Sequence, residues 1–175
     1  MKTAICAATA ALALGGSAQA AVVNTWESGF RIENRAVATT ATADQAWTAL
    51  GQIGHWWASE HTYSGSNGNL TIEMKPGGCW CEALPGGGVE HGRVVLVWPE
   101  QRMLRIDGAL GPLQDEGVSA ALTWQIKEVT GGVEIVQTYH VGGVRPEMMK
   151  NASLIDQVLA QQVEYLRAYL QPPVP

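Results

Sequence analysis

Short segments of alternating hydrophobic and polar residues dominate the chain from residue 70 to residue 141. Turns that contain Gly or Pro separate these segments, which is typical of an antiparallel meander. The pattern predicts strands over Leu70–Lys75, Gly78–Leu84, Val89–Trp98, Met103–Asp107, Ser119–Val129 and Val133–Val141. A weaker alternation over Glu27–Thr40 predicts one more strand before them.

Two short helical segments are expected after the first strand. Thr42 and Gln45 have the spacing of a capping box, in which each side chain bonds to the other residue's backbone N–H. Gly51 and Gly54 end this helix. A second helical turn is expected around Trp56.

The C-terminal segment predicts one long helix that ends before Pro172. Its start is open between Pro146, as a first helical residue, and Ser153, as an N-cap. Apolar residues recur along it with a period of 3.6, namely Leu154, Ile155, Val158, Leu159, Val163, Leu166 and Leu170.

These elements predict an α+β fold in which a curved antiparallel sheet of about seven strands wraps around the long C-terminal helix. The apolar face of the sheet needs a cover, and this helix is the only predicted element long enough to provide it. A gap between sheet and helix, closed at one end by the two short helices, is a natural ligand cavity.

Composition narrows the class of protein. The chain has 175 residues with a formal net charge of −5, and this length favours one domain over residues 21–175. No basic stripe is present, which argues against nucleic acid and against an anionic membrane surface as partners. The seven Trp suit cavity walls as well as a core.

The first twenty residues have the pattern of a secretory signal peptide. Lys2 precedes an apolar run over residues 4–14, and Ala18-Gln19-Ala20 has the small-x-small pattern of a cleavage site. The apolar run is too short to span a membrane. We therefore expect an exported, periplasmic or secreted protein that is cleaved near Ala20 and is not stably anchored in a membrane.

A glycine-rich hairpin carries the candidate chemistry. If Pro85–Gly88 forms a four-residue loop, Glu82 pairs with His91 and Trp80 with Arg93, all on one sheet face. Glu82 and His91 are then an acid/base couple, a polar anchor inside an apolar pocket, or an ordinary cross-strand pair. Hydrophobic patterning alone would bury the opposite face, which carries Cys79, Cys81, Val94, Leu96 and Trp98.

Cys79 and Cys81 do not form a C-x-x-C redox motif. Residues two apart in a strand lie about 6.5–7 Å apart, so a disulfide between them needs backbone distortion. An oxidising compartment would permit it, and free thiols are the alternative. The histidines lack the ligand spacing of a metal site, and no nucleotide-binding motif occurs, so neither a metal nor a cofactor is expected.

The order of several segments resembles the SRPBCC superfamily, which has the helix-grip fold of START lipid-transfer domains and of the birch pollen allergen. The resemblance covers about residues 30–170 and is carried by the Trp56-Trp57 pair, by Gly77-Gly78 with an aromatic and an acidic residue after it, and by Pro99 before Leu104. The chain is most similar to small secreted bacterial members that are labelled ATPase-activator-like or polyketide cyclase-like.

The resemblance implies a deep apolar cavity between the sheet and the C-terminal helix. It places Trp80, Glu82, His91, Arg93, Val95 and Val97 toward the cavity, with Trp56, Trp57, Trp124 and Tyr139 as further wall residues. The outer face would then be unusually apolar and would suit a partner or a second subunit, as in a homodimer.

Three functions remain open. The first is a non-enzymatic carrier or binder of a small hydrophobic or amphipathic molecule. The second is a cyclase- or hydratase-type enzyme that uses Glu82 and His91 as its acid/base pair. The third is a protein-interaction domain whose cavity is closed.

Overall fold

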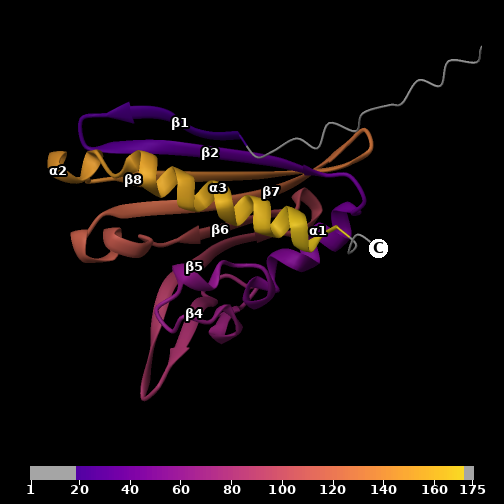
Figure 1. The fold of residues 1–175 in the computed structure, drawn as a ribbon, viewed down its shortest axis with the longest axis horizontal. Coiled ribbons are helices and arrows are strands. Elements are labelled where there is room, and N and C mark those ends of the chain that lie inside the picture. The colour runs from indigo at the N-terminus through magenta and orange to yellow at the C-terminus, as the bar shows by residue number, and fades with distance from the viewer. Residues whose placement is uncertain (1–18, 172–175) are drawn as a thin grey trace, which may run out of the picture.

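Eight strands form one antiparallel sheet in the computed structural model, which describes residues 19–171 (Figure 1). Their order across the sheet is β1-β2-β8-β7-β6-β5-β4-β3. The strands are β1 Gln19–Trp26, β2 Gly29–Ala38, β3 Leu70–Ile72, β4 Cys79–Leu84, β5 Gly87–Trp98, β6 Met103–Asp107, β7 Ser119–Val129 and β8 Gly132–Gly142. The predicted α+β fold is confirmed, with one strand more than expected.

The additional strand is β1, which pairs with β2. It runs across the predicted cleavage site at Ala20. Residues 1–18, which hold the rest of the predicted signal peptide, lie outside the described residues. Export of the protein therefore stays a prediction from the sequence.

Helix α1 begins and ends where local sequence signals place it, whereas the long helix does not begin at either predicted residue. The Thr42 hydroxyl accepts from the Gln45 amide at 3.2 Å, the Gln45 side chain accepts from the Thr42 amide at 2.8 Å, and Gly51 caps the other end of α1. The long helix has Asn151 at its N-cap, so Ser153 is not the cap, and Pro146 instead begins the separate short helix α2. The helices are α1 Ala43–Leu50, η1 Ile53–His55, η2 Ser59–His61, η3 Asn67–Asn69, η4 Pro99–Gln101, η5 Gly111–Glu116, α2 Pro146–Met149 and α3 Ala152–Tyr169.

Helix α3 covers the inner face of the sheet and runs from α2 toward α1 (Figure 1). Its buried side chains include Leu159, Val163 and Leu166, which join a core with Phe30 and Ile32 of β2. The closest approach of α3 is to β1, β2 and β8. The hairpin of β4 and β5 extends away from the helix, so the two diverge toward that end of the sheet.

The turn after α1 is tied directly to α3. The Ala58 amide donates to the Gln162 side chain at 2.9 Å, and Gln162 is fully buried. This bond fixes the position of the segment between β4 and α3.

Among residues 19–171, no helix is both long enough and apolar enough to cross a membrane.

Strand β5 contains two irregularities that decide which of its side chains point inward. The pairing with β4 shifts between Trp80 and Cys81, which leaves His91 as the extra residue. The pairing with β6 shifts between Val94 and Leu96. Each shift reverses the alternation of β5, so no single period-2 pattern describes the whole strand.

Two glycines, Gly92 in β5 and Gly108 directly after β6, allow the backbones of the two strands to approach each other closely. A Cβ on Gly92 would lie 2.6 Å from the Ile106 side chain, and a Cβ on Gly108 would lie 2.5 Å from the His91 carbonyl oxygen and 2.7 Å from the Gly92 Cα. The last two contacts are with backbone atoms, which cannot rotate away. The irregular segment at His91 therefore depends on the absence of side chains at these positions.

We predict that Gly108→Ala lowers the free energy of unfolding by about 1–3 kcal/mol, because the added methyl overpacks the backbone of β5. Urea denaturation measures this loss. Gly87→Ala is the matched control, since a Cβ at this position would meet nothing within 4 Å, and it should change stability by less than about 0.5 kcal/mol. Equal midpoints for both variants would contradict the close-approach argument.

Candidate functional site

The hairpin between β4 and β5 has a two-residue loop, Pro85-Gly86, and Leu84 pairs with Gly87. Pro at the second position of a turn and Gly with positive φ at the third suit a type II turn, and Gly86 has a φ of 74°. The predicted four-residue loop is therefore wrong, and so is the predicted register. Glu82 pairs with Val89, and Trp80 pairs with Gly92.

Glu82 and His91 still meet, because the true register differs from the predicted one by two residues at Glu82, which keeps both side chains on one face, diagonally across the two strands. Their side chains are both buried and are joined by a contact of 2.8 Å between His91 Nε2 and Glu82 Oε2. Trp80 is also buried, at 1% exposure. Trp80, Glu82 and His91 thus lie on the inner face, as the family resemblance implies. The assignment from hydrophobic patterning is wrong for this part of the hairpin.

Beyond His91, the face implied by the family resemblance is wrong on β5. Arg93 and Val95, which the resemblance places inside, are exposed, whereas Val94 is fully buried, as hydrophobic patterning predicts. Arg93 instead bonds to the Gly77 carbonyl and to Glu90. The two register shifts in β5 cause these reversals. On the outer face Val95 thus takes the place that the implied alternation gave to Val94, and a homodimer stays a prediction.

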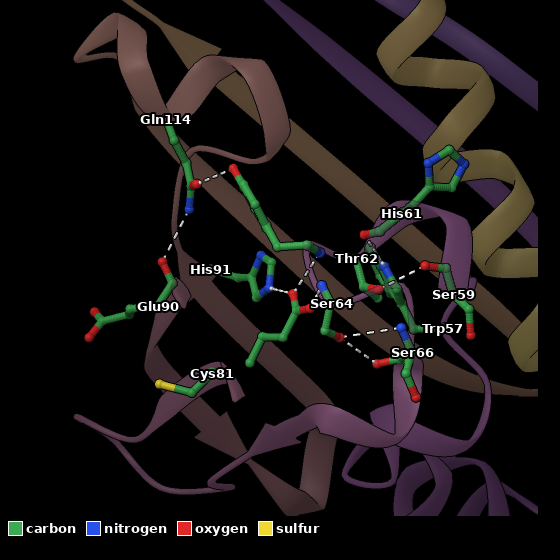
Figure 2. A network of polar contacts seen from close by, with 12 residues as sticks. Trp57, Ser59, His61, Thr62, Ser64, Ser66, Cys81, Glu90, His91 and Gln114 are labelled. Carbon is green, nitrogen blue, oxygen red and sulfur yellow. Dashed lines mark hydrogen bonds and ion pairs between the residues drawn. The ribbon is translucent and has the colours of Figure 1, made fainter. Parts of the chain in front are cut away.

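The buried Glu82 carboxylate is the centre of a polar network, of which Ser64, His91 and Gln114 are labelled in Figure 2. It accepts hydrogen bonds from the Tyr63 amide at 3.1 Å, from the Ser64 amide at 2.5 Å and from His91. The network continues outward, where the Tyr63 hydroxyl donates to Gln114 and the Gln114 amide donates to the Glu90 carbonyl. One carboxylate therefore holds the loop after η2, strand β4 and strand β5 together.

Burial raises the pKa of Glu82, but hydrogen bonds from Ser64, from the Tyr63 amide and from His91 outweigh it and hold the pKa below its ordinary value of 4.5. Glu82 is consequently a carboxylate at neutral pH. A carboxylate has no hydrogen to donate, so His91 Nε2 carries the hydrogen of their bond.

A cavity of about 370 Å³ lies between this wall and the first half of α3. Aromatic rings form one side of it: Trp57, Tyr63, Trp80 and His91. Aliphatic residues of α3 form the other side: Leu154, Ile155, Val158 and Leu159. Leu154 and Tyr63, which line the cavity, are 59% and 57% exposed, so the cavity reaches the surface of the protein at these residues.

The aromatic wall is a connected cluster. The rings of Trp57 and Trp80 meet edge to face with centroids 4.9 Å apart. The His91 ring lies 5.3 Å from Trp80 and 5.8 Å from Tyr63. Such contacts fix the orientation of each ring and make the wall rigid.

Of the predicted wall residues, Trp57, Trp80 and His91 line the cavity, and Glu82 lies directly behind His91. Trp56 and Trp124 do not line it. They pack edge to face with centroids 5.5 Å apart in the core, and the Trp56 indole donates to the Ala49 carbonyl at 2.7 Å.

Tyr139 is fully buried and does not line the cavity either. Its hydroxyl accepts from the Leu110 amide at 2.9 Å and donates to the Gly108 carbonyl at 3.2 Å. Burial raises the pKa of Tyr139, so the hydroxyl stays protonated. These two hydrogen bonds hold the loop Leu110–Pro112 in place, and this loop lines the cavity.

Sequence reasoning missed the two loops that complete the walls. Tyr63 comes from a polar loop and Leu110–Pro112 from the segment before β7, and neither follows a periodic pattern. Their placement depends on the long-range bonds to Glu82 and Tyr139. No local signal in the chain identifies them.

Cys79 and Cys81 are joined by a disulfide on the outer face of β4. Their Cα atoms are 5.4 Å apart, closer than in an extended strand, and the pairing with β5 shifts at the same point. With Glu90 they form the one group of potential metal ligands found within the described residues. Sulfurs that are bonded to each other do not supply the thiolates that bind a metal.

Comparison with known proteins gives structural matches only. No family model matches the chain, and no curated protein sequence does. A Rhodobacter sphaeroides protein of solved structure is 24% identical with a TM-score of 0.52, over 80% of this chain and 91% of that one. Major latex-like protein 151 from Panax ginseng is 12% identical with a TM-score of 0.57, over 83% of this chain and 100% of that one.

Truncated norcoclaurine synthase from Thalictrum flavum is 18% identical with a TM-score of 0.55, over 87% of this chain and 100% of that one. These matches, together with the sheet and helix described above, show that the chain has a helix-grip fold. At identities below 25%, they show the fold alone. The chemistry must therefore be argued from the site.

We predict that Glu82→Gln lowers the free energy of unfolding by about 2 kcal/mol at pH 7, because the buried charge-assisted hydrogen bonds are lost. The wild-type contribution is present above about pH 4.5 and is lost as pH falls through the lowered pKa. The variant should therefore lose less stability than the wild type between pH 7 and pH 3. Urea titrations at several pH values measure both effects.

Glu73→Gln is the control for this variant. Glu73 is exposed and pairs only with the exposed Lys75, a kind of pair that contributes little to stability. Parallel pH profiles for Glu82→Gln and the wild type would contradict the role assigned to the Glu82 carboxylate.

We predict that the double variant Cys79→Ser/Cys81→Ser is about 1–2 kcal/mol less stable than the oxidised wild type, as expected for the loss of a disulfide that closes a very short loop. Thermal unfolding with and without a phosphine reductant measures this. The reductant should lower the wild-type midpoint to that of the variant and leave the variant unchanged. A wild-type midpoint that ignores the reductant would contradict the prediction.

Proposed function

We propose that this protein is a non-enzymatic carrier or binder of a small amphipathic molecule, which it holds in the cavity between α3 and the aromatic wall. The observation that carries the proposal is the cavity itself, about 370 Å³ in volume, with apolar walls and a few polar groups set into them. Small-molecule sites have this size and this composition.

The construction of the site supports a binding role. Its polar groups are held by a network that needs no ligand, since Glu82 already accepts three hydrogen bonds. The aromatic rings also hold one another in place. A ligand therefore meets a preformed surface, and little ordering cost reduces its affinity.

An acid/base enzyme is the less favoured alternative. A general acid needs a raised pKa, whereas hydrogen bonds lower the pKa of Glu82 despite its burial. Any proton transfer would fall to His91, with Glu82 as its orienting partner. Norcoclaurine synthase is by its name an enzyme with a similar fold, so the fold itself does not decide between binding and catalysis.

An interaction domain with a closed cavity is less favoured again, because the cavity reaches the surface at Tyr63 and Leu154.

We also propose that the protein acts outside the cytoplasm. The signal-peptide pattern of residues 1–20 supports this, as does the disulfide between Cys79 and Cys81, which an oxidising compartment preserves.

We predict that Val158→Trp reduces the affinity for the fluorescent probe N-phenyl-1-naphthylamine at least about tenfold, because the indole fills the cavity that Val158 lines. Fluorescence titration measures the dissociation constant. Gln157→Trp is the matched control: it lies on the same helix but is exposed and outside the cavity lining, so it should bind like the wild type. A wild-type protein that binds no such probe would contradict the proposed function.

A further inference from the structure

The disulfide between Cys79 and Cys81 encloses a residue of the cavity wall. Trp80, which stands between the two cysteines, is buried and lines the cavity. Its ring packs against the rings of Trp57 and His91, with centroids 4.9 and 5.3 Å apart. Because successive residues of a strand point to opposite faces, a covalent bond on the outside of β4 constrains the backbone that carries a wall residue inside.

This bond shortens the first part of β4. The Cα atoms of Cys79 and Cys81 are 5.4 Å apart, whereas residues two apart in an extended strand lie about 6.5–7 Å apart. The pairing with β5 shifts at the same place, where His91 is the extra residue. The contraction of β4 and the bulge in β5 therefore occur together, at the point where each strand contributes one ring, Trp80 or His91, to the cavity wall. Without the bond, this part of β4 is free to lengthen by about 1 Å.

The disulfide is also accessible to a reagent. Both cysteines are partly exposed, and the residues paired with them across the hairpin, Glu90 and Arg93, are exposed. The bond encloses a single residue, so it gains little of the loop-closure entropy that stabilises a disulfide across a long loop. Exposed disulfides and those that distort the backbone are the more easily reduced ones. The Cys79–Cys81 bond thus has the properties of an exchangeable bond.

We propose that Cys79 and Cys81 form a redox site that exchanges with a dithiol, and that the oxidised site holds the cavity in its ligand-binding form. The oxidised bond keeps Trp80 against Trp57 and His91. Reduction releases β4, disturbs the contacts between these rings and lowers the affinity for ligand. The effect on affinity rests on the proposed binding function, whereas the exchange reaction does not.

The exchange balances without a cofactor. A thiolate of the dithiol attacks one sulfur of the pair and forms a mixed disulfide, and the other cysteine leaves as a thiolate that takes up a proton. The second thiol of the reagent then attacks its own sulfur in the mixed disulfide and releases the remaining cysteine. Two electrons and two protons pass from the dithiol to Cys79 and Cys81, and the reagent becomes a disulfide.

The affinity for N-phenyl-1-naphthylamine in each redox state tests the effect on the cavity. We expect the dissociation constant to rise at least about fivefold when dithiothreitol reduces the wild type, and to return after reoxidation. Cys79→Ser/Cys81→Ser should bind like the reduced wild type and should not respond to the reductant. This variant keeps Cys6, so it also controls for that cysteine. Thermal unfolding checks that every form is folded at the temperature of the titration.

A second measurement follows from linkage between the two sites. If a ligand prefers the oxidised form, it must oppose reduction by the same factor by which reduction weakens its binding. Alkylation of free thiols and mass spectrometry measure the ratio of reduced to oxidised protein in a buffer of reduced and oxidised dithiothreitol. A saturating concentration of the probe should lower this ratio at least about fivefold in the wild type. The same concentration should change it far less in Val158→Trp, whose cavity is filled.

The outcomes separate the inference from the function on which it rests. Equal dissociation constants in the two redox states would overturn the effect on the cavity and leave the binding function in place. A disulfide that dithiothreitol reduces only after urea has unfolded the protein would overturn the redox site. If the probe binds neither form, the proposed function fails together with the effect on affinity, and alkylation still decides whether the bond exchanges.

Discussion

The buried Glu82 carboxylate is the interaction on which the site depends. A carboxylate in an apolar interior is stable only when its oxygens are hydrogen-bonded, and here the donors are the amides of Tyr63 and Ser64 and the ring of His91. These donors come from a loop and from a neighbouring strand. The same bonds that keep Glu82 ionised therefore place Tyr63 and His91 on the cavity wall.

The cavity follows from the way α3 lies on the sheet. The helix is closest to β1, β2 and β8, and the hairpin of β4 and β5 lies at the far end of the strand order. The aromatic wall and the loop Leu110–Pro112 border the space between that end and the helix but do not fill it. Tyr139 holds this loop from the core, so a residue expected in the cavity wall supports the wall from behind.

Most elements of the fold were predictable because their signals are local. The strands Met103–Asp107 and Ser119–Val129 have the predicted bounds, since a sheet with one buried face imposes a period of two on the chain. The capping box of Thr42 and Gln45 needs only residues that are three apart. The face of α3 that covers the sheet was also expected, because a period of 3.6 identifies it.

Within the site, the sequence alone determined that a glutamate, a histidine and several tryptophans lie near a hairpin turn. Tertiary structure decided the register of the hairpin, the reversals that send Arg93 outward and Val94 inward, and the loops that complete the cavity. The physical reason is that a β-bulge is set by contacts between strands, here the close approach of Gly92 and Gly108. The polar loop around Tyr63 has no periodicity, and its position is fixed only by long-range hydrogen bonds to Glu82.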